Sequence, residues 1–324
     1  EELMRKIGDL GFLGVTVPEA YGGLEMDFVS TMLVCDYISG ASGSLSTAFG
    51  AHTGIGTLPI TLYGTEEQKQ KYVTKLASGE WFGSYCLTEP GAGSDANSGK
   101  TKAVLSEDGT HYSITGQKMW ISNAGFANVF IVFARIEDDK NITGFIIPNT
   151  TDNGITLGEE ENKLGIHSSS TRQVFFNDTL IPIGNMLSER GQGFKIAMNA
   201  LNVGRIKLAA ACLDAQRRIV DESIKYAKER IQFDKPIAGT QLQQKKLAEM
   251  ITEITKAQLL AWRLGVLKNE GKASSAQISM AKRNNVAMAA AIAREARQVL
   301  GGMGITGDYS IMRHMMNLES VITY

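Results

Sequence analysis

The chain has 324 residues, of which 43% are hydrophobic and 21% charged, and its formal net charge is −1. This balance is that of an ordinary globular protein, and the length exceeds what one hydrophobic core normally serves, so we expect two or three packed units. The near-neutral charge without a long basic run excludes the electrostatic signature of a nucleic-acid binder. No apolar run reaches the length of a membrane span, so we expect no transmembrane segment.

Cysteine and histidine usage argues against metal chemistry. Cys35, Cys86 and Cys212 lie far apart among apolar neighbours, and the four histidines are equally scattered. Neither set has the spacing of a metal site, so we expect buried free thiols and a reducing compartment. The first residues show no signal-peptide pattern and begin inside a helical pattern, from which we expect a native start further upstream.

Residues 1–80 have the pattern of helices separated by glycine-rich breaks. Thr65 is a good helix N-cap, and Gln68 three positions later completes a capping box. The period changes near residue 84. Two alternating runs, 102–105 and 111–114, flank an Asp-Gly turn, which predicts a hairpin. Further strands are expected at 128–136, 142–148 and 173–176. With no helix between them, they favour an antiparallel sandwich or barrel.

Helical periodicity returns after Gly193. One helix is expected from Phe194 to about Arg230, a second along an apolar stripe from Leu247 to Leu264, and a third from Ser274 or Ser275 to Leu300. Long helices with short connections are typical of a bundle. The fold class is therefore α+β, with a helical domain at 1–82, a β domain at 83–187 and a helical bundle at 188–324.

Two glycine patterns need interpretation. Gly302, Gly304 and Gly307 match the spacing of the dinucleotide fingerprint, but a helix precedes them where that motif needs a strand, so we reject a Rossmann site. The plain alternative is that Gly301 and Gly302 end the helix. The loop at 90–93 reads Pro-Gly-Ala-Gly and lies between polar residues, which suits a ligand with phosphate or carbonyl groups.

Four stretches together resemble the acyl-CoA dehydrogenase family. Residues 85–95 read Tyr-Cys-Leu-Thr-Glu-Pro-Gly-Ala-Gly-Ser-Asp and are similar to its first signature, and 298–304, Gln-Val-Leu-Gly-Gly-Met-Gly, to its second. Residues 116–124, Gly-Gln-Lys-Met-Trp-Ile-Ser-Asn-Ala, resemble its flavin-contacting segment, and 163–166 with 170–171 match a further stretch. The part after residue 244 is similar to the glutaryl-CoA branch, and 204–212 to very-long-chain and general bacterial members.

The resemblance implies FAD between the β domain and the C-terminal helices, and conversion of an acyl-CoA thioester to a trans-2-enoyl-CoA. Electrons then pass to an electron-transfer flavoprotein, in the bacterial cytoplasm or the mitochondrial matrix. It also implies a homodimer or homotetramer in which a neighbouring subunit completes each flavin site. The cofactor-binding residues that it implies are Leu87, Thr88, Trp120, Ser122, Arg230, Phe233, Gln298, Gly301 and Gly302. The substrate-binding residues are Ser94, Asn202, Arg205 and Tyr324.

The catalytic residue is unknown within this chain. The resemblance places a glutamate base directly after a tyrosine near the C-terminus, which here means directly after Tyr324. A minority of members carry it just before the arginine that corresponds to Arg205, where this chain has Gly204, and glycine cannot accept a proton.

The substrate is expected to be a monocarboxylic acyl-CoA. A second carboxylate buried in the acyl pocket needs a cation, because an unpaired buried charge costs several kcal/mol or more. The glutaryl branch supplies an arginine from the N-terminal helical region, whereas residues 37–58 here contain no Arg or Lys. Alternative functions are an acyl-CoA oxidase and a dehydrogenase-fold flavoprotein with an assembly role.

Overall fold

The computed structural model describes residues 1–150 and 152–324, which form two compact units. The first, called here the sheet unit, comprises Glu1–Met26, Thr47–Asn162 and Ser168–Gly204. The second, called the helical unit, comprises Asp27–Ser46, Lys163–His167 and Arg205–Tyr324. Two helices, α3 (Gly43–Gly50) and α7 (Gly193–Ala210), contribute residues to both units.

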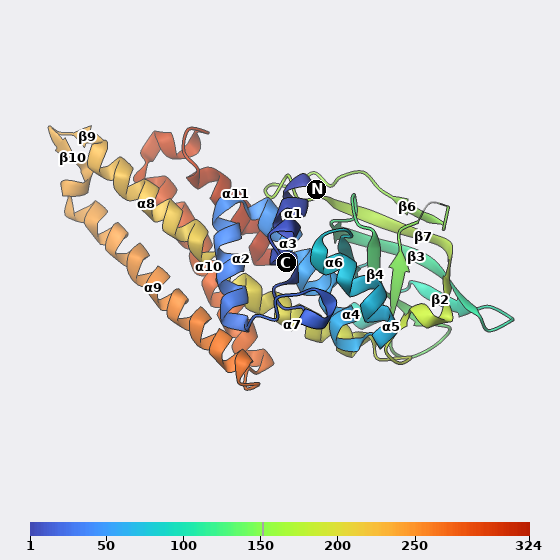
Figure 1. Cartoon of the computed structure of the whole chain (residues 1–324). Helices are drawn as coiled ribbons and strands as arrows, with labels where there is room; N and C mark the ends of the chain where they lie inside the picture. Colours follow the sequence, from blue (N-terminus) through green and yellow to red (C-terminus); the bar gives the residue numbers. More distant parts are fainter. Residues whose placement is uncertain (151) are drawn as a thin grey trace. The chain divides into compact units, whose positions relative to one another are not determined.

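The sheet unit contains eight strands in one mixed sheet, which Figure 1 shows in green. The order is β6-β7-β3-β2-β4-β5-β8, and β1 pairs with β4. Most neighbours are antiparallel, but β1 and β2 both run parallel to β4. The strands are β1 (Gly83–Cys86), β2 (Lys102–Leu105), β3 (His111–Ser122), β4 (Val129–Ile136), β5 (Thr143–Pro148), β6 (Ile155–Leu157), β7 (Thr171–Pro182) and β8 (Met186–Leu187).

Strand β4 is buried on both faces of the sheet. Its side chains alternate between two apolar clusters, with Val129, Ile131 and Phe133 in one and Phe130 and Val132 in the other. The first cluster also contains residues of the short helices, so one face of the sheet is covered by them. A strand buried on both sides reads as a continuous apolar run. The helices of this unit are α1 (Glu2–Asp9), α4 (Leu58–Tyr63), α5 (Glu66–Gln68) and α6 (Thr74–Ser78).

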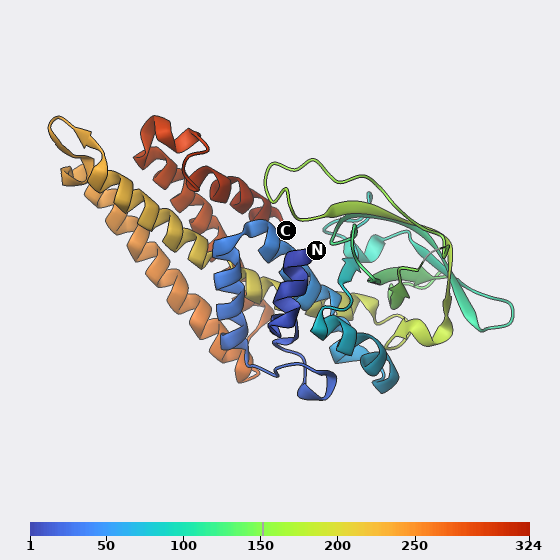
Figure 2. The ribbon, with the colours of Figure 1, turned by 45° about the horizontal axis from the view of Figure 1, so that its top comes forward.

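The helical unit is a bundle with a single apolar core, to which Ile254, Ala257, Ala261 and Leu264 of α9 contribute. In Figures 1 and 2, α8, α9 and α10 run side by side, and the β9–β10 hairpin lies at one end of α8 and α9. The elements are α2 (Phe28–Ala41), α8 (Leu213–Glu229), β9 (Ile231–Gln232), β10 (Lys235–Pro236), α9 (Gln241–Asn269), α10 (Ser275–Val299) and α11 (Ile311–Thr323).

Several expectations about the fold are confirmed. The order of helical, sheet and helical parts is as predicted, and so are the capping box of Thr65 and Gln68 and the 102–114 hairpin, where Gly109 has φ +68°. The three cysteines are buried and free. The start of α10 carries a second capping box, formed by Ser274 and Gln277.

Three expectations need correction. The sheet is mixed, because the chain crosses over between β1 and β4 and between β2 and β4. The helix predicted from Phe194 to Arg230 is two helices, α7 and α8, separated by a turn at Ala211 and Cys212. The predicted apolar stripe of α9 includes Ile251, which is 48% exposed, because the neighbouring Met250 is the residue that faces the core at this turn.

One stretch within the described residues, Gly193–Glu229, is apolar and long enough to cross a membrane by length and composition alone. The expectation that no run reaches this length was therefore too strict. Buried core helices pass the same test, and 56% of this stretch's most apolar window is buried.

Candidate functional site

The first part of the site is where β1 and β3 of the sheet unit meet. Leu87 and Thr88 follow β1 directly, and the Met119 N–H donates to the Thr88 carbonyl over 2.9 Å, which ties this loop to β3. The pairing of β3 with β7 shifts register between Lys118 and Ile121. The structure therefore brings together the predicted flavin contacts Leu87, Thr88 and Trp120, two from the loop and one from the bulge.

Trp120 has a strained backbone conformation and an exposed side chain. Its φ is +57°, which is rare for a bulky residue and costs on the order of 1–3 kcal/mol. Its side chain is 61% exposed, whereas Lys118 two positions earlier is 1% exposed. In a regular strand these two side chains share a face. The bulge therefore turns the indole outward, where it offers a flat apolar surface to a ring.

The Thr88 backbone offers an open donor beside this indole. Among the described residues, neither the amide nor the hydroxyl of Thr88 forms a hydrogen bond, although Thr88 is half-buried. Polar groups at a partly buried position normally have partners. An aromatic face next to an unpartnered donor fits a planar heterocycle with carbonyl groups.

Ser122 ends β3 next to this surface. It pairs with Thr171 of β7, and its carbonyl accepts a hydrogen bond from the Ser84 hydroxyl over 2.5 Å. The next residue, Asn123, has φ +66° and is fully buried, and its side-chain amide donates to the Ala48 carbonyl. These bonds fix where the chain leaves the strand, and Ser122 itself stays half-buried.

Beneath the loop lies a buried ion pair that the sequence analysis did not single out. The Lys118 ammonium lies 2.7 Å from a Glu89 carboxylate oxygen, and both side chains are at least 93% buried. Burial opposes ionisation of both groups. For Glu89 the charge of Lys118 and the hydrogen bonds outweigh burial and lower its pKa, whereas burial dominates for Lys118 and lowers the pKa of its ammonium. The only signal in the sequence was that Glu89 and Lys118 lie in the stretches 85–95 and 116–124 that carry the family resemblance.

The glycine-rich loop after Glu89 has a bare backbone. Glu89 and Ala92 exchange two backbone hydrogen bonds of 3.1 Å, which closes a tight turn. A Cβ added at Gly91 or Gly93 meets nothing within 4 Å, and neither glycine has a left-handed φ. Neither the fold of the turn nor packing within the chain requires glycine here, which supports the interpretation that a ligand approaches this backbone. Ser94, on the same loop, is exposed.

The remaining predicted residues lie on separate elements. Asn202 and Arg205 lie on α7, and both are half-buried. Arg230 follows α8, and Phe233, at the tip of the β9–β10 hairpin, is 91% exposed with φ +51°. Gln298, Gly301 and Gly302 are exposed at the end of α10. An exposed phenylalanine at a hairpin tip suits contact with another molecule.

The end of α10 shows which glycines the fold requires. Gly301 has φ +58° and follows the last turn, as expected for a helix end, whereas Gly302 has no left-handed φ. A Cβ on Gly304 would lie 2.1 Å from the Arg297 carbonyl oxygen. Packing accounts for Gly304 and backbone conformation for Gly301. Neither accounts for Gly302, whose added Cβ meets nothing within 4 Å.

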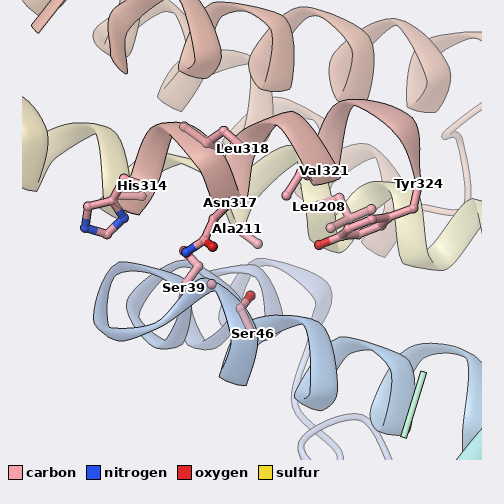
Figure 3. A pocket seen from close by; sticks show the side chains of 11 residues that line it. Ser39, Ser46, Leu208, Ala211, His314, Asn317, Leu318, Val321 and Tyr324 are labelled. Carbon is pink, nitrogen blue, oxygen red and sulfur yellow. The ribbon is translucent and has the colours of Figure 1, made fainter. Parts of the chain in front are cut away.

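The helical unit contains a narrow pocket beside Tyr324, shown in Figure 3. One face of α11 provides one wall, with His314 and Tyr324 at opposite ends, and Ser39 and Ser46 lie across from it. The remaining lining residues are Gly43, Leu208, Ala211, Ala215, Asn317, Leu318 and Val321.

No lysine or arginine is among the residues that line this pocket. Its one histidine, His314, is 3% exposed, and burial, aided by the charge of Arg313, lowers its pKa to about 4. The imidazole is therefore neutral at pH 7. Within the described part of the chain, no group of three or more His, Cys, Asp or Glu side chains is placed to hold a metal ion.

Comparison with known proteins identifies the family. Models of the N-terminal, middle and C-terminal domains of acyl-CoA dehydrogenases match residues 1–80, 84–179 and 191–322. A probable acyl-CoA dehydrogenase of Bacillus subtilis (strain 168) is 48% identical over 78% of the chain, although the match spans only 42% of that relative. An acyl-CoA dehydrogenase of the same organism is 39% identical over the whole chain and 85% of the relative.

Solved structures agree. Butyryl-CoA dehydrogenase from Megasphaera elsdenii has a TM-score of 0.96 and 36% identity, covering all of this chain and 86% of that one. A glutaryl-CoA dehydrogenase from Mycobacterium smegmatis in complex with FADH2 has a TM-score of 0.94 and 37% identity, covering 100% and 82%. The chain belongs to the acyl-CoA dehydrogenase family. FAD is the cofactor of this family of oxidoreductases.

Proposed function

We propose that this protein binds FAD and oxidises an acyl-CoA thioester between its α and β carbons, giving a trans-2-enoyl-CoA. The observation that carries the proposal is the outward Trp120 indole beside the unpartnered Thr88 amide. These groups fit one face and one polar edge of a flavin ring. Bound there, FAD supplies the acceptor for the β-hydride.

The chain's own residues hold and orient the reactants. Trp120 packs on the ring, and Leu87, Thr88 and Ser122 donate hydrogen bonds to it. On the FAD of a neighbouring subunit, Arg230 and Gln298 hold the diphosphate half and Phe233 packs beside it, while the bare backbones of Gly301 and Gly302 allow close approach. Ser94, Asn202, Arg205 and Tyr324 are the residues proposed to contact the CoA ester. Fixed donors are effective because they are already oriented when charge develops on the thioester oxygen.

The base is proposed to be a glutamate directly after Tyr324. Removal of the α-proton needs a carboxylate within hydrogen-bond reach of it. The alternative position, Gly204, offers no side chain, although a Cβ there would meet only Ile55, at an ordinary 3.8 Å. Replacing the proposed glutamate with glutamine is expected to abolish turnover while FAD stays bound. A non-acidic residue directly after Tyr324 would contradict the proposal.

The substrate is proposed to be a short monocarboxylic acyl-CoA. The pocket beside Tyr324 has no lysine or arginine in its lining, and His314 is neutral, so a terminal carboxylate placed there stays unpaired. Similarity to a butyryl-CoA dehydrogenase supports a short chain.

The experiment is anaerobic mixing of the FAD-loaded protein with butyryl-, octanoyl-, palmitoyl- and glutaryl-CoA. We expect butyryl-CoA to bleach the flavin fastest and to give the highest kcat/KM with an artificial acceptor. Preference for glutaryl-CoA would overturn the substrate assignment. Absence of bleaching by every thioester would overturn the dehydrogenase proposal and favour the assembly role.

The electron acceptor is proposed to be an electron-transfer flavoprotein, as the family resemblance implies. The rival is oxygen, which would make the protein an acyl-CoA oxidase. The two are separated by mixing substrate-reduced protein with either air or an electron-transfer flavoprotein and following reoxidation at 450 nm, a flavin absorption band. We expect reoxidation by the flavoprotein to be at least 100-fold faster, and equal rates would favour the oxidase.

A further inference from the structure

Lys118 is a buried cation to which the proposed reaction gives no role. Its ammonium donates three hydrogen bonds, to the Leu87 carbonyl (3.2 Å), a Glu89 carboxylate oxygen (2.7 Å) and the Phe133 carbonyl (2.6 Å). An ammonium has three protons, so all of its donors are used. Two of the three acceptors belong to the loop that carries Thr88.

The bond to Leu87 fixes the direction of the next amide. The carbonyl of Leu87 and the N–H of Thr88 belong to one planar trans peptide, in which they point in opposite directions. Because Lys118 holds the Leu87 carbonyl inward, the Thr88 N–H points outward. The bond from the Met119 N–H to the Thr88 carbonyl fixes the following peptide in the same way.

The bulge of β3 directs the side chains of Lys118 and Trp120 to opposite sides. Lys118 points into the interior and Trp120 points out, although only one residue lies between them. A ring packed on Trp120 therefore meets the Thr88 amide from the side opposite to Lys118. The lysine acts on such a ring only through the peptide that it orients.

Glu89 keeps the lysine in place. Its carboxylate also accepts the N–H groups of Lys100 (2.5 Å) and Thr101 (3.1 Å), and a Cβ on Gly99 would come within 2.8 Å of one oxygen. The ion pair thus fastens the loop to β2 and β4 as well as to β3. Removing only one partner leaves a buried charge without compensation.

We propose that Lys118, with Glu89 as its counter-ion, is a positioning residue that aims the Thr88 amide at the flavin ring. This rests on the proposed FAD-dependent function. An oriented N–H favours the extra negative charge of a reduced ring, so the pair sets flavin affinity and raises the flavin's reduction potential.

The test compares the double variant Lys118→Met with Glu89→Gln, which leaves no unpaired buried charge, with the wild type. Asn185→Leu is the matched control, because Asn185 is also buried in the sheet unit and donates two hydrogen bonds, to Ile146 and Tyr72. The readouts are thermal unfolding of the FAD-free proteins, FAD affinity by fluorescence quenching, the midpoint potential of the bound flavin, and hydrogen exchange at the Thr88 amide with saturating FAD.

We expect the double variant to bind FAD at least tenfold more weakly, with a more negative midpoint potential and without the slowing of Thr88 exchange that FAD causes in the wild type. The control keeps an FAD affinity within twofold of the wild type. The inference is overturned if the double variant keeps affinity, potential and slow exchange, or if the control loses them equally. A wild type that does not bind FAD instead overturns the proposed function itself.

Discussion

His314 makes the stability of the folded protein depend on pH. Its pKa falls from 6.5 to about 4 on folding, mainly through burial, with the charges of Arg313, Arg218, Glu222 and Asp214 around it. Because the unfolded chain takes up the proton first, the stability due to neutral His314 is complete above pH 6.5 and is lost as the pH falls towards 4. The shift corresponds to about 3 kcal/mol.

We therefore expect urea unfolding of the wild type to show a loss of stability between pH 6.5 and 4.5 that His314→Asn lacks. The carboxylates that titrate in the same range are common to both proteins, so the difference between the two pH profiles isolates the histidine. Parallel profiles would show that the folded protein binds a proton at this position as readily as the unfolded chain does.

At the residue scale, sequence reasoning proposed Thr88 and Trp120 as flavin contacts and missed the buried ion pair behind them. Thr88 and Trp120 could be proposed from the sequence because they lie in motifs, and a motif ties a residue type to a position. The inward lysine and glutamate belong to the same motifs, yet no periodicity shows that a bulge reverses Trp120 relative to Lys118. The site assignments themselves stay predictions.

At the scale of elements, two capping boxes provide a matched comparison. The side-chain oxygen of Gln68 in α5 accepts the Thr65 N–H, and its NH2 group donates to the carbonyls of Gly184 and Met186. The capping bonds of Gln277 in α10 stay within its own helix end. Replacing a cap residue costs about 1 kcal/mol. Two unpaired, part-buried carbonyls add about 2 kcal/mol.

Gln68→Ala is therefore expected to cost about 3 kcal/mol and Gln277→Ala about 1 kcal/mol, measured as changes in the free energy of unfolding. Equal costs would show that the bonds from Gln68 to Gly184 and Met186 do not contribute to stability.

The contact between α2 and α8 depends on one glycine. A Cβ on Gly40 would lie 1.6 Å from an Asp214 carboxylate oxygen, which accepts from Arg218, while Arg217 bridges Asp214 and Asp36. Gly40→Ala must therefore separate the helices or break this network, at a cost of about 3 kcal/mol. Gly50, where an added Cβ meets nothing and φ is −65°, is the control.

Thermal unfolding of both glycine variants tests this. Gly50→Ala is expected to be neutral or to stabilise by about 0.5 kcal/mol, because alanine restricts the unfolded chain. A Gly40→Ala protein as stable as the wild type would show that the helices pack less closely than described.

Helices and strands were predictable where the hydrophobic periodicity extended over many residues or where a turn or cap had a characteristic sequence. The 102–114 hairpin and the start of α10 at Ser274 follow from local chemistry, which the chain carries near each position. The break between α7 and α8 was missed because Ala211 and Cys212 are no helix breakers, so tertiary packing decides it. The parallel pairing of β1 and β2 with β4 joins distant segments, and no local pattern reports it.

At the scale of the whole molecule, the order of the three parts followed from changes of period, which average over many residues. The boundaries at 82/83 and 187/188 stay predictions. The compact units are built from segments that alternate along the chain, and Asp27–Ser46, for example, belongs to the helical unit. The oligomeric state rests on the proposal that Arg230, Phe233 and Gln298 bind the FAD of a neighbouring subunit. Their exposure on the hairpin and at the end of α10 supports it.

Complementation between subunits tests that proposal. Trp120→Ala damages the ring contact, and Arg230→Glu damages the diphosphate contact by placing a negative charge beside phosphate; each alone is expected to lower FAD occupancy strongly. If the two contacts of one site come from different subunits, a mixed dimer has one site with both defects and one site with neither. Co-expression with two affinity tags isolates the mixed dimer, and we expect FAD in half of its sites, measured by absorbance per chain. If both contacts come from the same subunit, every site in the mixed dimer carries one defect, and its FAD content stays as low as that of the single variants.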